Sequence, residues 1–124
     1  MIKVKHFMDD PEHDDGTRIW IEPIGLTRDL RRWCKVDFLV PELGPPVALA
    51  AWFEQHPDGY AYFREHYHAV LYVHPDRDAL RKLVDLGAKY NVTLLHQSDD
   101  PRHNSATALL EFLREAWTTA PTGA

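Results

Sequence analysis

The chain has 124 residues, with 14 lysine and arginine residues against 19 aspartate and glutamate residues, so it fits a single domain and carries a formal net charge of -5. This acidity disfavours the phosphate backbone of nucleic acid as a partner, and no apolar run approaches the ~18 residues that a membrane helix requires. Because the single cysteine, Cys34, excludes an intrachain disulfide and the first residues lack the apolar core of a signal peptide, the sequence predicts a cytoplasmic protein with no membrane partner.

Two strands are predicted in the first part of the chain. Residues 2–8 alternate apolar and polar side chains, which is the period of a strand with one solvated face. After a turn-forming segment at 9–16, residues 18–21 form a short run rich in β-forming residues, which Pro23 and Gly25 halt. We expect this second strand to be apolar on both faces, as in a parallel sheet that helices cover.

A short helix and a third strand are predicted next. Thr27 can cap the helix through its hydroxyl oxygen, and the helix continues through Cys34 with Leu30 and Trp33 facing inward. We interpret Cys34 as a small, half-buried apolar residue. Residues 36–40 predict the next strand, and a loop rich in proline and glycine follows it.

Three helices are predicted after this loop. The first begins at Pro46 and ends at His56, where Pro57 prevents its continuation. The second presents an inward stripe at three-and-four spacing, and the third, opened by Pro75 and Asp76, presents another. The inward residues are Tyr60, Phe63, Tyr67, Val70 and Leu71 in the second helix and Leu80, Leu83 and Val84 in the third, which ends at Gly87 or Asn91.

The last predicted elements are a strand and a helix. Residues 92–95 carry no charge and predict a central strand. After a polar loop, the inward face of the last helix consists of Ala106, Leu109, Leu110, Leu113 and Trp117. The order of elements predicts the α/β class: a small three-layer domain over residues 1–117, with a mostly parallel sheet of about four strands flanked by helices, and a disordered tail at 118–124.

Two loops are candidate ligand-binding segments. In open parallel sheets, ligands bind beyond the carboxyl ends of the strands, where helix N-termini and loop amides converge. This rule selects the loop after strand 18–21 and the loop after strand 92–95. The candidate residues for binding a small polar molecule are Glu22, Gly25, Thr27, Arg28, His96, Gln97 and Ser98.

Residues near the start of the last helix are candidate catalytic residues. His103 would act as an acid, a base or a hydrogen-bond donor, and Asn104 would orient the substrate. Asp99, with its neighbour Asp100, would supply a further acid or base. In the alternative interpretation, His103 and Asn104 only cap and solvate the first helical turn, and the two adjacent acids are solvated loop residues.

The sequence predicts no metal site. His96, His103 and Asp99 are residue types that zinc uses, but no metal motif has their spacing. His66 and His68 are two residues apart and point in different directions on a helix, so we expect both to be exposed or half-buried. The cofactor is left unknown, and the chain contains neither a glycine-rich phosphate loop nor a nucleophile elbow.

The order of several short motifs resembles the YeaO-like family of bacterial proteins, which is domain of unknown function 488. The likeness spans most of the chain. The motifs are Asp15-Gly16-x-Arg18, Gly25-Leu26-Thr27, Trp52-Phe53-x-x-His56-Pro57, Phe63 with Tyr67, Val92-Thr93-Leu94-Leu95, and Asp100-x-x-His103-Asn104-x-Ala106. The resemblance implies a compact α/β fold with a pocket between the loop after the second strand and the His-Asn turn, and it implies no established reaction.

The chain departs from the family pattern in both loops. After the second strand, family members usually continue with Asp-Arg-Leu-Trp-Pro-Arg-Gly, whereas this chain has Glu22-Pro23-Ile24-Gly25 and lacks both arginines and the tryptophan. After the last strand, His96-Gln97-Ser98-Asp99 replaces aromatic and basic positions, which makes the rim more acidic and less suited to a phosphate. The resemblance therefore implies a divergent member with a changed ligand or none.

Three functional hypotheses follow from these observations, and whether the protein is an enzyme is left open. The favoured hypothesis is a small-molecule-binding or enzymatic domain that uses the two loops. The second is a non-catalytic interaction or regulatory protein, with a homodimer as one version, because Trp52, Phe53, Tyr60 and Tyr62 surround His56 on two helices. The third is a metal-dependent hydrolase.

Overall fold

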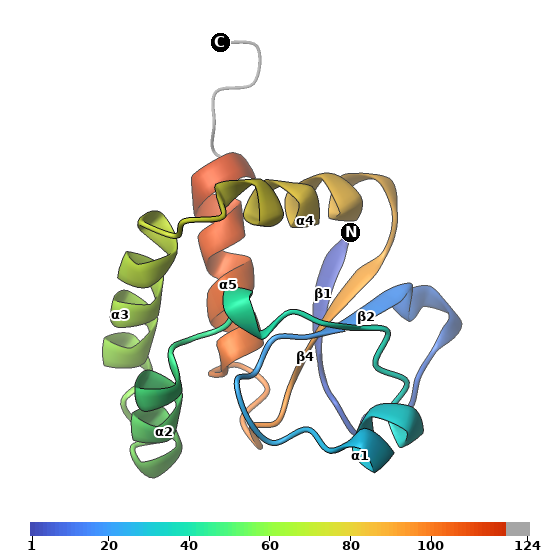
Figure 1. Ribbon diagram of the computed structural model, residues 1–124, viewed down its shortest axis with the longest axis horizontal. Helices are drawn as coiled ribbons and strands as arrows, with labels where there is room; N and C mark the ends of the chain where they lie inside the picture. The colour runs from blue at the N-terminus through green and yellow to red at the C-terminus, as the bar shows by residue number, and fades with distance from the viewer. Residues whose placement is uncertain (119–124) are drawn as a thin grey trace, which may run out of the picture.

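Strand β4 (Val92–His96) lies in the middle of the sheet, paired in parallel with β1 (Ile2–His6) on one side and with β2 (Thr17–Trp20) on the other. The short strand β3 (Phe38–Leu39) pairs in parallel with β2 and completes the order β1-β4-β2-β3 (Figure 1). This computed structural model describes residues 1–118. The predicted α/β fold, with a parallel sheet of four strands and a central last strand, is confirmed.

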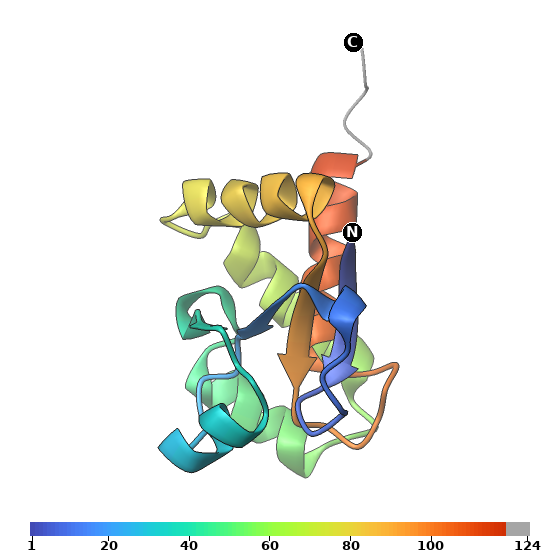
Figure 2. The same cartoon turned by 90° about the vertical axis from the view of Figure 1, so that its right-hand side faces the viewer.

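Five helices connect and cover these strands. They are α1 (Arg28–Trp33), α2 (Val47–Gln55), α3 (Tyr60–Tyr72), α4 (Arg77–Lys89) and α5 (Ser105–Leu113). The 3₁₀ turns His13–Asp15 and Pro41–Leu43 and a π-helical turn, Arg114–Thr118, complete the regular structure. Helix α4 crosses the end of the sheet at which the strands begin, whereas α1 and α2 lie toward the end at which the strands finish (Figure 1 and Figure 2).

Each face of the sheet carries its own hydrophobic core, because successive side chains of a strand point to opposite faces. Ile19 of β2 and Leu94 of β4 belong to the main core, which α3, α4 and α5 cover. Their neighbours Trp20 and Leu95 belong to a second, smaller core. The other buried members of that second core are Phe7, Cys34 and Val36, with Leu26 and Leu30 packed against it. Helices therefore lie on both sides of the sheet, and both faces of β2 are buried, although the charged side chain of Arg18 shares a face with Trp20.

Side-chain caps begin α1 and α4, as predicted from Thr27 and Asp76. The Thr27 hydroxyl oxygen accepts a hydrogen bond from the Leu30 amide at 3.2 Å, and an Asp76 carboxylate oxygen accepts one from the Ala79 amide at 3.0 Å. Of the two predicted ends of α4, Gly87 is wrong, since the helix passes through it and ends at Lys89 with Tyr90 as its C-cap, directly before Asn91. Gly87 is needed inside the helix because a Cβ there would overlap the Ile2 side chain of β1.

Three expectations about burial are corrected by the structure. Trp33 does not face inward but is 81% exposed, because α1 is only six residues long and reaches the second core through Leu30. His68 is buried rather than half-buried, because its Nε2 atom makes a 2.7 Å hydrogen bond with the Ala108 carbonyl of α5. With His68 on the inner face of α3, Val70 is exposed.

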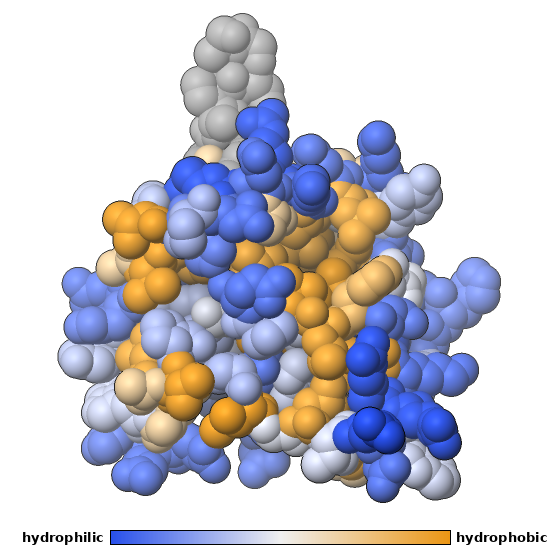
Figure 3. Space-filling view, in the orientation of Figure 1, coloured by the Kyte–Doolittle hydropathy of each residue, from blue (hydrophilic) through white to orange (hydrophobic). Residues whose placement is uncertain are grey.

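The aromatic residues around His56 serve mainly as packing. Trp52, Phe53 and Tyr60 are half-buried against the main core, and Tyr62 is exposed. On the face shown in Figure 3, hydrophobic side chains form separate groups that hydrophilic residues interrupt. The homodimer that these aromatics suggested stays a prediction.

The third strand is shorter than the predicted range of 36–40. Only Phe38 and Leu39 pair with β2, and both are exposed because the strand is an edge of the sheet. Within residues 1–118, none of the helices combines the length and the hydropathy needed to cross a lipid bilayer. Residues 119–124 of the predicted tail lie outside the described residues.

Candidate functional site

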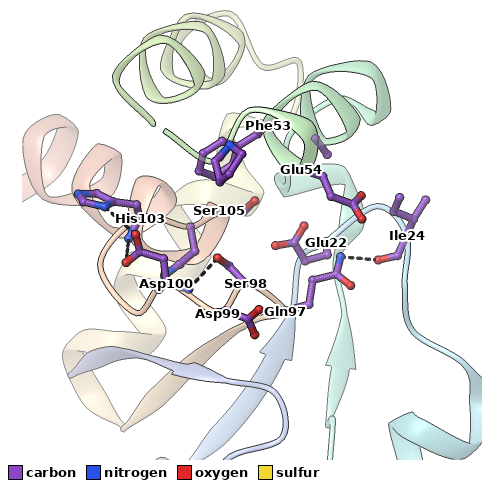
Figure 4. Close-up of a pocket in the computed structure, with 13 residues that line it drawn as sticks. Glu22, Ile24, Phe53, Glu54, Gln97, Ser98, Asp99, Asp100, His103 and Ser105 are labelled. Carbon is purple, nitrogen blue, oxygen red and sulfur yellow. Dashed lines mark hydrogen bonds and ion pairs between the residues drawn. The ribbon is translucent and has the colours of Figure 1, made fainter. Parts of the chain in front are cut away.

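A cavity of about 440 Å³ opens at the carboxyl ends of β2 and β4. It lies between the loops that follow these two strands and helix α2 (Figure 4). Its wall consists of Glu22, Ile24, Ala50, Phe53, Glu54, Pro57, Gln97, Ser98, Asp99, Asp100, His103, Asn104 and Ser105. The crevice expected from parallel sheets is therefore present at the predicted edge.

The pairing of β2 with β4 brings the two loops together. The strands run parallel with Trp20 opposite Leu95, so their following segments leave the sheet side by side. Gln97 Nε2 then donates a hydrogen bond to the Ile24 carbonyl at 3.1 Å, which ties one loop to the other. Gly25 has a positive φ of 101°, and a Cβ there would overlap the Gln97 amide. Only glycine fits this close contact between the loops.

Glu22 lies at the floor of the pocket and is only 6% exposed. Burial raises the pKa of its carboxyl group to about 7, and the nearby Glu54 carboxylate acts in the same direction. Hydrogen bonding from Ser105 and Gln97 opposes this rise without cancelling it. Figure 4 shows the Glu22 carboxylate between the Ser105 hydroxyl and the Glu54 carboxylate. Glu22 is therefore a buried acid that can change its charge near neutral pH.

Helix α2 and the turn after it provide the apolar side of the pocket. Ala50, Phe53 and Pro57 face the cavity from this side, with Glu54 beside them. Phe53 is held by a stacked contact with Phe63 of α3, whose ring centroid is 4.3 Å away. The pocket thus combines one apolar wall with an acidic floor and rim.

The loop between β4 and α5 is built from local hydrogen bonds to side chains. The Asp100 carboxylate accepts from the backbone amides of Arg102 at 2.9 Å and His103 at 3.2 Å. Its other oxygen lies 2.9 Å from His103 Nδ1. The amide of Arg102 and the His103 side chain lower the pKa of Asp100 below its usual range. These contacts hold His103 at the rim, with its ring 4.8 Å from that of Tyr60 and directed away from Glu22 (Figure 4).

Asn104 occupies the cap position that the alternative interpretation gave it. Its Oδ1 accepts from the Thr107 amide at 2.8 Å, and its Nδ2 donates to the Asp100 carbonyl at 3.0 Å. The side chain is 1% exposed, although the residue contributes to the pocket wall. Both ends of the amide are thus engaged within the chain. His103 and Asn104 precede α5 rather than lying in its first turn.

Four of the predicted binding residues lie outside the pocket wall. Gly25 packs under Gln97, Thr27 caps α1, and Arg28 lies with the basic residues of α1. His96 is buried beside His6, with ring centroids 5.5 Å apart, and its Nδ1 accepts from the Ser98 amide at 3.2 Å. Burial, helped by His6, lowers the pKa of His96 to about 4. The wall does include the predicted residues Glu22, Gln97, Ser98, Asp99, His103 and Asn104.

Sequence reasoning missed the contribution of α2 to the pocket. Phe53 and Glu54 are separated from Glu22 by some thirty positions, and no local pattern indicates that α2 turns toward the ends of the strands. Ser105, the first residue of α5, was missed as well. Among residues 1–118, no three His, Cys, Asp or Glu side chains are placed to hold a metal ion together.

Comparisons with known proteins identify the family. The family model described as the inactive DUF488-N3 subclade, DUF488-N3i, matches residues 1–123. The chain is also 31% identical over 119 residues to the uncharacterized protein YeaO of Escherichia coli strain K12, an alignment that covers 91% of this chain and 96% of YeaO. No solved structure gives a significant match. The chain therefore belongs to the YeaO-like DUF488 family, in the branch described as the inactive DUF488-N3 subclade.

Proposed function

We propose that this protein binds a small polar molecule in the pocket at the ends of β2 and β4 and does not convert it. The observation that carries the proposal is a cavity of about 440 Å³ with the buried Glu22 carboxyl at its floor. Pockets of this size, with an apolar wall and a few polar groups, are typical small-molecule sites. A buried carboxyl that faces a cavity gives such a site a strong hydrogen-bond acceptor.

The placement of the predicted catalytic residues favours binding over catalysis. The Asn104 amide already bonds within the chain at both ends and the residue is 1% exposed, so its placement serves the cap rather than a substrate. The His103 ring points away from Glu22, and its Nδ1 is engaged by Asp100. The description of the matching subclade as inactive agrees with a binding role without catalysis.

Ligand screening by NMR tests this proposal. The protein is titrated with a mixed panel of small anionic, neutral polar and cationic molecules, and the backbone amide signals of Gln97, Ser98 and Ser105 are followed. Ala50→Trp fills the cavity from α2, since Ala50 lines it. Ala48→Trp is the matched control, because Ala48 lies on the same helix and is exposed.

Binding by at least one member of the panel should shift the pocket amides in the natural protein and in Ala48→Trp, and should be lost in Ala50→Trp. The same ligand should raise the unfolding temperature of the natural protein. The proposal fails if no panel member shifts these amides, or if folded Ala50→Trp binds as well as Ala48→Trp.

A further inference from the structure

The charges that face the pocket are predominantly negative. Its wall contains the four acidic residues Glu22, Glu54, Asp99 and Asp100. Within the described part of the chain, no lysine or arginine belongs to this wall. Such a wall creates a negative potential inside a concave, partly apolar site, where charges interact more strongly than in open water.

The groups around Glu22 do not neutralise its carboxylate with a positive charge. Ser105 and Gln97 offer only neutral donors, and Gln97 Nε2 also donates to the Ile24 carbonyl. On the α3 side, Tyr67 is fully buried, and its hydroxyl donates to the Leu43 carbonyl at 2.6 Å. Burial makes the ionised form of a carboxyl group unfavourable when no cation is close to it. A positively charged group that entered the pocket would therefore stabilise the Glu22 carboxylate.

An anionic ligand is disfavoured even though α5 begins beside the pocket. The N-terminus of a helix ordinarily attracts an anion through its free amides. Here Asn104 Oδ1 already accepts from the Thr107 amide, and the Ser105 hydroxyl is directed at Glu22 (Figure 4). An incoming carboxylate or phosphate would have to lie next to the Glu22 and Glu54 carboxylates.

We infer that the pocket takes a ligand with a positively charged nitrogen group, an alkylammonium or amidinium, carried on a small apolar body. The charged nitrogen would pair with Glu22 and Glu54, and the apolar body would lie against Ala50, Phe53 and Pro57. Charge-assisted hydrogen bonds from a nitrogen to a carboxylate are about twice as strong as neutral ones. This inference rests on the proposed function, because it specifies the chemistry of the same site.

The inference requires binding to depend on pH. Because the pKa of Glu22 is about 7 without ligand, a cation that pairs with the carboxylate displaces its proton at lower pH. Affinity should therefore fall by up to tenfold for each pH unit below about 7. The other titratable groups that face this region are Glu54 on α2, Tyr67 on α3, and Asp99, Asp100 and His103 in the loop before α5. The dependence of ligand affinity on pH in the Glu22→Gln variant isolates the contribution of these other groups.

A matched series of three ligands tests the charge directly. Benzamidine, benzamide and benzoate share one shape and are cationic, neutral and anionic near neutral pH. Each is titrated into the full chain by NMR up to about 10 mM, with Glu22→Gln, Glu54→Gln and the control Glu65→Gln measured alongside. Glu65 is exposed on α3 and is not part of the pocket wall.

Benzamidine should bind at least tenfold more tightly than benzamide, and benzoate should bind least. Glu22→Gln should weaken benzamidine binding at least tenfold and remove most of its pH dependence, Glu54→Gln should weaken it less, and Glu65→Gln should leave it unchanged. Equal binding of all three ligands, no binding of benzamidine, or full binding to Glu22→Gln would each overturn the inference. In those cases, pocket binding by neutral or anionic members of the panel would still support the proposed function. If no panel member bound in the pocket either, the inference and the proposed function would both be overturned.

Discussion

The Asp15 carboxylate lies 2.7 Å from the Arg18 guanidinium, and both side chains are almost fully buried beside the inner strand β2. Arg18 also donates to the carbonyls of Phe7, Cys34 and Lys35, so it joins β2 to the segments that follow β1 and α1. Burial alone would raise the pKa of Asp15, but hydrogen bonds from Lys3, from the Glu12 amide and from Arg18 hold it well below its usual range. This cluster borders the second core, because Arg18 binds the backbone carbonyls of two of its members, Phe7 and Cys34.

Replacement of Asp15 should therefore destabilise the protein strongly. Asp15→Asn leaves the Arg18 charge buried without its carboxylate, a change that typically costs about 3–5 kcal/mol of unfolding free energy. Urea unfolding near neutral pH measures this loss. Asp14→Asn is the control, because Asp14 forms an exposed ion pair with Lys3 and should cost less than about 1 kcal/mol. Equal effects of the two variants would contradict the structure.

Glu22 should make the protein less stable as pH rises. Its pKa is raised from 4.5 to about 7, so its carboxyl favours the folded state when protonated. That contribution is fully present below about pH 4.5 and is lost as pH rises through about 7. This shift in pKa corresponds to about 3 kcal/mol of unfolding free energy. Glu22→Gln should remove this pH dependence in urea unfolding and should be more stable than the natural protein at about pH 8, whereas Glu65→Gln should follow the natural profile.

His96 should have the opposite effect in the acidic range. Burial favours its neutral form, with a pKa of about 4 instead of 6.5, so the contribution to stability is present above about pH 6.5 and is lost as pH falls through about 4. Its full size is about 3 kcal/mol. His96→Gln should flatten the acid limb of the stability profile. Ring signals of His96 in NMR should titrate near pH 4, and titration near the ordinary histidine pKa of 6.5 would contradict its burial.

The cap formed by Asn104 should stabilise α5. Asn104→Ala removes the acceptor for the Thr107 amide and the donor to the Asp100 carbonyl, and loss of a cap of this kind costs about 1–2 kcal/mol. Denaturant unfolding measures the change, with Asn91→Ala as a control at an exposed position. If the two variants are equally stable, Asn104 does not act as a cap.

Much of the fold could be predicted because local patterns and the core agree. The apolar run at 92–95 indicated a central strand, and Thr27 and Asp76 marked helix starts through their capping oxygens. The parallel pairing of β2 and β4 was predicted from their mainly apolar runs, 18–21 and 92–95. Sequence reasoning failed where a tertiary contact decided the outcome, as for His68, whose partner is a carbonyl forty positions away.

The candidate site was predicted in its loops but not in its walls. The rule that ligands bind beyond parallel strands located Glu22 and Gln97, since it needs only the order and direction of the strands. It could not locate Phe53 and Glu54, because the position of α2 depends on how Phe53 stacks on Phe63. The Asp15–Arg18 pair was missed because both residues lie in segments that resemble an ordinary turn and strand.

The two edges of the sheet differ in how firmly they are held. Strand β1 pairs with β4 along all five of its residues, whereas β3 adds only Phe38 and Leu39, both exposed to water. Backbone amides of a short, solvated edge open with little free energy, and those of a central strand open only with global unfolding. In deuterated solvent, the amide protons of β3 would thus exchange first and those of β4 last. The sheet would therefore open at its β3 edge, next to α1, while the strand pair β2–β4 below the pocket stayed folded.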